Sequence, residues 1–226
     1  MQAIFSSISF SYNPLIGAFT ASQHGHIPSI AMRYSKEHKA ETHARIVQKA
    51  SERFRAEGVG AVGVGSLMQS LGLTVGGFYA HFESKEDLIA QACRSGFSAT
   101  NTRFKAYLET KPPGHQFAAL VEAYLSPQHR DGPDAGCFAA ATGAELARHP
   151  DETRAALAEQ VDAWIDVIAT AMENDKLDGE ARGIAGTLVG CLILARAMPD
   201  RAISDAFLDS GRKAALASTR PRTVPA

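Results

Sequence analysis

The sequence predicts an all-α protein in which a small helix-turn-helix domain is followed by a larger helical domain. Three observations favour this fold class. Apolar residues recur at helical spacing along most of the chain, and no segment shows the sustained apolar–polar alternation of a half-buried strand. Two very short helical runs, joined by a turn containing glycine, directly follow a longer helix. With 226 residues, 45% of them hydrophobic, the chain can bury a sizeable core.

The first expected element is an amphipathic helix over residues 36–57. Its apolar face is formed by Ile46, Val47, Ala50 and Phe54, and charged side chains fill the opposite face. Gly58 follows at once, which predicts a helix that ends there, because glycine readily adopts the left-handed conformation of a C-terminal cap.

Gly58, Gly60 and Gly63 also have the spacing of a dinucleotide-binding loop, with Glu83 in the place of a ribose-binding acid. Such a loop requires a buried strand before the glycines, and here a charged helix precedes them. We therefore expect no cofactor. The three cysteines are widely spaced, without a Cys/His cluster, so we expect no metal site either.

The helix-turn-helix itself is expected in residues 64–71 and 75–82, with Thr74 as the N-cap of the second helix. Ser84 and Asp87 have the spacing of a capping box, which predicts that a new helix begins there. A loop is expected over 126–134, and the other expected helices cover 115–125, 135–148, 151–173, 178–197 and 200–216.

These elements divide the chain into four parts. Residues 1–31 carry no charged side chain and are interpreted as a flexible extension, the alternative being an ordered arm that packs on the body. The DNA-binding domain is expected over 32–83, the larger domain over 84–217 and a disordered tail over 218–226.

Composition narrows the possible partners. The net charge is −1, so contact with nucleic acid needs a local basic patch rather than bulk charge. The most apolar segment, residues 183–198, is shorter than the roughly 20 residues that span a bilayer, so we expect no membrane partner. Three cysteines without a signal peptide favour reduced thiols in the cytoplasm.

The segment GLTVGGFYAHFESKEDLI, residues 72–89, resembles the signature of the TetR family of bacterial transcriptional regulators. The three-helix stretch over 36–82 is similar to the family as well. The resemblance implies an all-α homodimer whose helix-turn-helix reads a palindromic operator in double-stranded DNA. It also implies a C-terminal domain that holds a small-molecule effector and the dimer interface, with repression relieved by that effector.

By this resemblance Tyr79, His81 and Lys85 match positions that touch phosphates, although Tyr79 and His81 could instead pack the small domain. The other expected DNA contacts are Thr42, Arg45, Thr74, Val75, Gly76 and Gly77. The chain departs from the family in two ways: Gly63 stands where Thr or Ser commonly begins the second helix, and no Lys or Arg occurs between Arg55 and Lys85. Residues 33–55, with seven basic side chains against three acidic ones, are expected to compensate.

The larger domain is expected to hold a cavity among aromatic residues, each of which could equally be plain core: Phe104, Tyr107, Phe117, Tyr124, Phe138 and Trp164. The expected dimer interface includes Gly186, Leu188, Gly190 and Ile193, the alternative being a buried helix of a monomer. Three other functions stay open: a redox- or electrophile-responsive repressor that senses through Cys137, a small helical enzyme, and an architectural protein without sequence preference.

Overall fold

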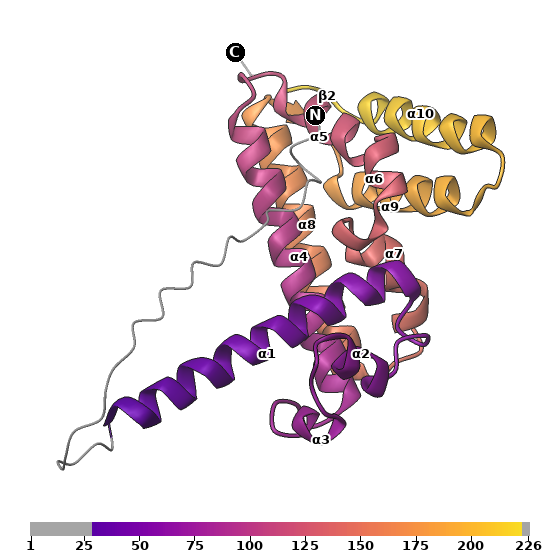
Figure 1. The fold of residues 1–226 in the computed structure, drawn as a ribbon. Helices are drawn as coiled ribbons and strands as arrows, with labels where there is room; N and C mark the ends of the chain where they lie inside the picture. Colours follow the sequence, from indigo (N-terminus) through magenta and orange to yellow (C-terminus); the bar gives the residue numbers. More distant parts are fainter. Residues whose placement is uncertain (1–28, 223–226) are drawn as a thin grey trace, which may run out of the picture.

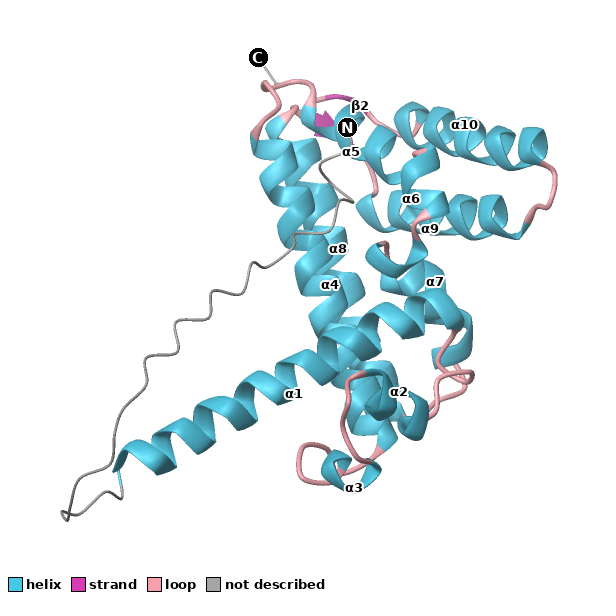
Figure 2. Ribbon diagram, in the orientation of Figure 1, coloured by secondary structure: helices cyan, strands magenta, loops and turns pink. Residues whose placement is uncertain are grey.

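The computed structural model describes residues 29–222, and these are almost entirely helical (Figures 1 and 2), which confirms the all-α prediction. The first helix, α1 (Ser29–Glu57), begins earlier than the expected 36 and runs well beyond the rest of the molecule at its N-terminal end (Figure 1). The predicted extension over 1–31 therefore ends too late, since residues 29–31 are helical. The rest of that extension lies outside the described residues.

Two short helices, α2 (Val64–Ser70) and α3 (Val75–Phe78), follow α1 and form the expected helix-turn-helix. Gly58 ends α1 with φ +88°, in the left-handed region, and its N–H donates to the Phe54 carbonyl at 3.0 Å. The next glycine, Gly60, donates its N–H to the Glu145 carboxylate at 2.9 Å. The glycine loop thus contacts another helix of the same chain and connects two helices, and the element directly before it is helix α1 rather than a strand.

Two long helices, α4 (Lys85–Glu109) and α8 (Asp151–Asn174), lie side by side and form the spine of the larger domain (Figure 1). The Ser84 hydroxyl accepts from the Asp87 N–H at 3.1 Å, as the capping box predicts. The Asp87 side chain reaches back to the N–H of Glu83, one residue before the position expected for a capping box.

The connection between α5 (Gln116–Tyr124) and α7 (Phe138–Leu146) differs from the prediction. The expected loop over 126–134 contains α6 (Pro127–Asp131) and the 3₁₀ turn η2 (Pro133–Ala135). Each begins with proline, because the fixed φ of proline and its missing N–H suit the first position of a helix. The helix expected from residue 135 consequently starts later, at Phe138.

The last two helices, α9 (Ala181–Ala197) and α10 (Arg201–Ala217), pack against each other along one side of the molecule (Figure 1). Two very short strands, β1 (Leu177–Asp178) and β2 (Arg220–Pro221), pair antiparallel beside them. The expectation of disorder from residue 218 is therefore wrong for residues 218–222. The pairing joins segments that are distant in the sequence, and two-residue strands leave no alternation to detect.

One continuous hydrophobic core runs through both parts of the molecule. It includes Phe54 of α1, Phe78 of α3, Phe97 of α4 and Phe138 of α7, all 2% exposed or less. Helix α1 packs against α4, η2 and α7. The helix-turn-helix domain is thus built onto the larger domain. No helix among the described residues is long and apolar enough to cross a bilayer.

Candidate nucleic-acid interface

The start of α3 is held by a local cap. The Thr74 hydroxyl accepts from the Gly77 N–H at 3.3 Å, which confirms Thr74 as the N-cap. Phe78 is fully buried and stacks on Phe82 with ring centroids 5.2 Å apart. The buried phenylalanine fixes α3 to the core, so the opposite side of this four-residue helix faces outward.

Two large side chains lie exposed on that outward side. Val75 is 51% exposed and Tyr79 is 70% exposed, unusual values for an aliphatic and an aromatic residue in a small domain. Gly76 is exposed, and an added Cβ there would meet no other atom within 4 Å, so a flat surface can approach the backbone closely. Gly77 is half-buried. This arrangement brings Thr74, Val75, Gly76 and Tyr79 to one surface.

Two of the expected phosphate-contacting residues, Lys85 and His81, also contact other residues of their own chain in this structure. The Lys85 ammonium donates to the Val59 carbonyl at 3.0 Å, so in this structure it also braces the loop between α1 and α2. The His81 ring is half-buried between His43 and Phe82, at centroid distances of 5.9 and 6.2 Å. Burial, together with the nearby His43 and Lys39, lowers the pKa of His81, which favours the neutral ring.

On α1, Arg45 is exposed, whereas Thr42 is only 8% exposed. The prediction that Thr42 faces the DNA backbone is therefore wrong for this structure, because Thr42 lies on the buried side of α1. The basic surplus of α1 is also smaller than its composition suggests. Arg53 pairs with Glu57 at 2.6 Å, Lys49 lies 3.6 Å from Glu52, and Arg55 points into the interior.

Helix α2 begins differently from α3. Gly63 occupies the N-cap position in extended backbone conformation and offers no side chain to accept a hydrogen bond. Nothing lies within 4 Å of where its Cβ would be. The departure from the family pattern at Gly63 thus leaves the N-terminal N–H groups of α2 without a side-chain cap.

In the larger domain, three of the expected cavity residues contact one another. Phe104 and Trp164 have ring centroids 5.0 Å apart, Tyr124 and Trp164 stack at 5.2 Å, and Phe104 and Tyr124 lie 6.1 Å apart. All three side chains are buried, and among the described residues neither the Tyr124 hydroxyl nor the Trp164 Nε1 makes a hydrogen bond of good geometry, although the Tyr124 hydroxyl lies near the Cys137 thiol. We call Phe104, Tyr124 and Trp164 the aromatic trio.

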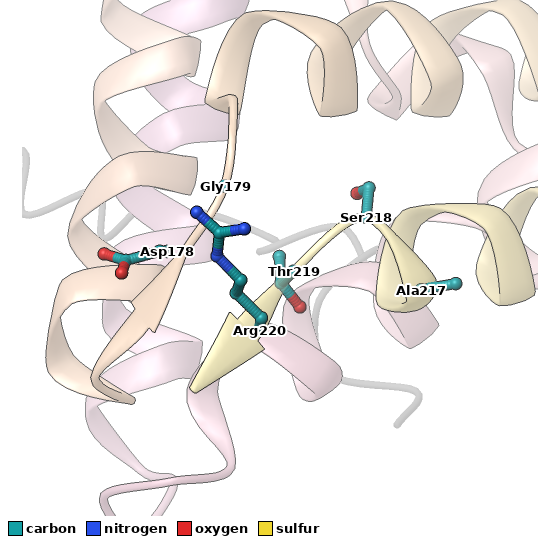
Figure 3. Close-up of a pocket in the computed structure, with 6 residues that line it drawn as sticks. All are labelled: Asp178, Gly179, Ala217, Ser218, Thr219 and Arg220. Atoms are coloured by element: carbon teal, nitrogen blue, oxygen red, sulfur yellow. The ribbon is translucent and has the colours of Figure 1, made fainter. Parts of the chain in front are cut away.

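The other three expected cavity residues are spread through the domain. Phe117 is buried at the start of α5, Phe138 lies 6.2 Å from Phe97, and Tyr107 is half-buried beneath the Lys111 ammonium. A hollow of about 260 Å³ lies elsewhere, beside the β1–β2 pair (Figure 3). None of the expected cavity residues lines it; its lining is Asp178, Gly179, Ala217, Ser218, Thr219 and Arg220.

The expected interface residues on α9 do not share one environment. Gly186 is exposed, an added Cβ at Gly186 or Gly190 would meet nothing within 4 Å, and Ile193 is 39% exposed. Leu188 is fully buried in the core of its own chain, so its place in an interface is wrong. Sequence reasoning missed three further exposed apolar residues on α9 and α10: Leu194, Ile203 and Leu216. Gly186, Gly190, Ile193 and Leu194 share one side of α9 by their helical spacing, and we call them, with the exposed Ile203 of α10, the apolar face on α9 and α10.

Three buried or half-buried arginines were also missed. Arg55, Arg103 and Arg196 donate to backbone carbonyls between residues 129 and 136. In sequence each reads as an ordinary charge on a solvated helix face, and no local signal separates it from its neighbours. Cys137, beside them, is 3% exposed. The structure thus gives no support to the alternative function in which Cys137 is an accessible sensing thiol.

Comparison with known proteins agrees with the fold described above. The family model for bacterial regulatory proteins of the tetR family matches residues 46–92, and that for a tetracyclin repressor-like C-terminal domain matches residues 113–208. A sequence comparison with curated proteins found no significant match.

Solved structures share the fold at low identity. The reduced form of NemR from E. coli has a TM-score of 0.69 at 17% identity, covering 81% of this chain and 100% of NemR. A TetR-family regulator from Chloroflexus aurantiacus has a TM-score of 0.65 at 21% identity, covering 80% of this chain and 95% of its own. One from Cytophaga hutchinsonii has a TM-score of 0.64 at 20% identity, covering 80% and 96%. With both domains matched, this chain belongs to the TetR family and is a DNA-binding transcriptional regulator.

Proposed function

We propose that this protein is a homodimeric repressor that binds a palindromic operator through α3 and is released by a small-molecule effector. The observation that carries the proposal is the outward surface of α3. Tyr79 stands 70% exposed directly after the buried Phe78, and the capped start of the helix presents Thr74, Val75 and Gly76 beside it.

The chemistry of this surface suits DNA. The Tyr79 hydroxyl and the Arg45 guanidinium can donate to phosphate oxygens, which supply affinity and position the protein. Thr74 can hydrogen-bond to a base edge, and Val75 can pack against a thymine methyl group. Gly76 and Gly77 have no side chain that could contact a base, so direct base readout rests on Thr74 and Val75. The remaining specificity comes from DNA shape.

A second copy of the chain fits the apolar face on α9 and α10. Exposed Ile193, Leu194 and Ile203 lie on these helices, and the open surfaces of Gly186 and Gly190 permit close helix approach. A two-fold dimer would present two α3 helices to half-sites about 34–36 Å apart. An effector would release the operator by binding better to a conformation in which this spacing is lost.

The test is binding of the full chain to DNA upstream of its own gene, at two salt concentrations and with nonspecific competitor. A repressor of this kind should resist competitor on one palindromic stretch and bind more weakly as salt rises, because phosphate contacts release counterions. Equal loss of binding at all sites would identify an architectural protein. Absence of binding at low salt would contradict the proposal.

A matched pair of variants tests the surface itself. Arg45→Ala and Lys105→Ala each remove one exposed positive charge, the first from α1 and the second from α4 in the larger domain. Only Arg45→Ala should weaken operator binding, with the salt slope reduced by about one unit. Equal effects of the two variants would show that Arg45 acts through net charge alone.

A further inference from the structure

Three guanidinium groups from three helices meet around Gly136 in the α6–α7 connection. Arg55 of α1 donates through Nη1 to the Gly136 carbonyl at 3.3 Å, and Arg103 of α4 donates through Nη2 to the Ala135 carbonyl at 2.5 Å. The Nη2 of Arg196, from α9, lies 3.0 Å from where a Cβ on Gly136 would be. We call Arg55, Arg103 and Arg196 the arginine cluster.

Among the described residues, no member of the arginine cluster forms an ion pair with a carboxylate. Glu52 and Asp134 attract Arg55, and Asp131 attracts Arg196, only from beyond ion-pair distance. Arg130 nearby shows the usual arrangement, with Asp131 at 2.8 Å and Asp205 at 2.5 Å. Buried charges in proteins are normally paired, because an unpaired charge in the interior is costly.

Each member of the arginine cluster also keeps one buried N–H group without a partner. These groups are Arg55 Nε, Arg103 Nε and Arg196 Nη1. Burial, together with the nearby charge of Arg103, lowers the pKa of Arg55 to about 10, against the weaker opposing effect of Glu52 and Asp134. Arg55 is nine-tenths buried, so solvent does not supply the missing acceptor.

The adjacent His129 does not supply it either. Its Nε2 accepts from the Cys137 N–H at 3.0 Å, so its Nδ1 carries the proton and donates to the Tyr124 carbonyl at 2.6 Å. Both ring nitrogens are thereby engaged. Burial and the nearby Arg196 lower the pKa of His129 to about 3, so the ring is neutral at physiological pH.

The arginine cluster adjoins the aromatic trio. The Tyr124 ring meets His129 edge-on at 4.7 Å. The Tyr124 hydroxyl, which makes no hydrogen bond of good geometry, lies near the Cys137 thiol and the Arg196 charge. The buried aromatic trio, with two polar groups on Tyr124 and Trp164 that make no hydrogen bond of good geometry, thus lies beside three guanidinium groups that form no ion pair.

We propose that the arginine cluster binds the acidic group of the effector, a carboxylate whose flat apolar body packs against the aromatic trio. This inference rests on the proposed function, in that it names the chemical class of the effector. A carboxylate can accept paired hydrogen bonds from a guanidinium, and so would meet both the charge and the free N–H groups.

The position of Arg55 explains how binding of such a ligand would affect the DNA-binding surface. Arg55 lies in the last turn of α1, between Phe54 in the core and the Gly58 cap that opens the helix-turn-helix. A carboxylate that draws Arg55 from the Gly136 carbonyl changes how α1 sits against η2. Because α1 positions α2 and α3, the spacing between the two helix-turn-helix domains of a dimer would change.

Trp164 is the only tryptophan of the chain and belongs to the aromatic trio, so its fluorescence reports on this site without DNA. The experiment titrates the full-length protein with benzoate and with benzamide, a neutral probe of nearly the same shape. We expect a saturable change in Trp164 emission with benzoate, at a concentration about ten-fold or more below that required for benzamide. Acetate and inorganic phosphate are titrated alongside.

Arg103→Gln, at a half-buried position, should weaken benzoate binding about ten-fold and leave benzamide unchanged. Arg196→Gln serves as the second variant, and circular dichroism checks that both fold. The matched control is Arg94→Gln on the same helix, where the arginine is exposed and pairs with Glu159 on the surface. It should bind benzoate as the wild type does.

Equal titration by benzoate and benzamide, or benzoate binding that survives both cluster variants, would overturn the inference. So would the absence of any saturable change with all three anions up to about 10 mM. These readouts need no operator, so they remain decisive even if the DNA-binding experiment fails. Conversely, an operator that is bound but never released by carboxylates leaves the proposed repressor standing and rejects this effector class.

Discussion

The helix-turn-helix domain (α1–α3), which we call the reading head, and the larger domain from α4 onward, which we call the effector domain after its proposed role, stabilise their key polar groups in different ways. The two helix starts on either side of the outward surface of α3 are capped locally: Thr74 caps the helix that follows it, and Ser84 does the same for α4. The arginine cluster, which joins α1 to the effector domain, reaches carbonyls across 32 to 81 positions of sequence and still leaves N–H groups unpartnered. The reading surface thus rests on local caps, whereas the arginine cluster keeps buried N–H groups without acceptors.

The proposed roles of the two regions account for this difference. A surface that reads DNA is exposed to water before it binds. Its polar groups are therefore hydrated in the unbound protein and do not lower the free energy of unfolding. A site that encloses a small molecule must hold polar groups ready in a low-dielectric interior, where each unpartnered group lowers stability. The predictions that follow test this contrast, beginning with the support of the head.

Phe78→Ala should have the largest effect. Phe78 is fully buried and carries α3, so its loss should lower the free energy of unfolding by about 3–5 kcal/mol, through lost burial and the cavity left behind. Urea denaturation measures this directly. Tyr79→Ala, one residue further and 70% exposed, is the control and should change stability by no more than about 0.5 kcal/mol. Similar losses for the two variants would refute the division between support and reading surface.

The second prediction concerns acid and the effector domain. Because the pKa of His129 falls from about 6.5 in the unfolded chain to about 3 in the folded one, the unfolded chain binds the extra proton between these values. Stability should therefore decrease as pH falls through this window, by about 1.4 kcal/mol per unit, or about 2 kcal/mol in total by pH 5.

Urea denaturation at pH 8, 6.5 and 5 measures this dependence, and His129→Gln provides the comparison. The variant is expected to be less stable at every pH, because it loses the hydrogen bonds to Tyr124 and Cys137, but its stability should depend less steeply on pH. Parallel curves for the variant and the wild type would show that His129 is not the group that titrates.

The same contrast decides what the sequence could predict. The reading head was predictable because its determinants are local: the glycine that ends α1, the threonine and serine caps, and the dense motif over 72–89. Even there, burial had to be seen in three dimensions. Thr42 and Arg55 occupy ordinary positions of an amphipathic helix, and only the packing of α1 against α4 and η2 turns them inward.

The effector domain was predictable only in outline. The helical spacing predicted the bounds of α8, α9 and α10 to within a few residues. Pro127 and Pro133, in contrast, led to the prediction of a loop, whereas in the structure each begins a short helical turn. The arginine cluster joins α1, α4 and α9, and no periodicity links residues so far apart. The β1–β2 pair and the burial of Leu188 were missed for the same reason, since each depends on a partner distant in the sequence.

The smallest expected effect concerns the N-terminal caps of α2 and α3 in the reading head. Thr74 caps α3, whereas Gly63 leaves α2 without a side-chain cap, in a backbone conformation that serine adopts easily and with free space around its Cβ. Gly63→Ser should raise the free energy of unfolding by about 0.5 kcal/mol, through the new cap and the lower entropy of the unfolded chain. Operator affinity should rise as well, because a serine hydroxyl at the start of α2 can donate a hydrogen bond to a phosphate oxygen. Gly72→Ser, at φ +72°, is the control and should destabilise. A gain in stability without a gain in affinity would place the start of α2 away from the DNA, and leave α1 and α3 as the whole reading surface.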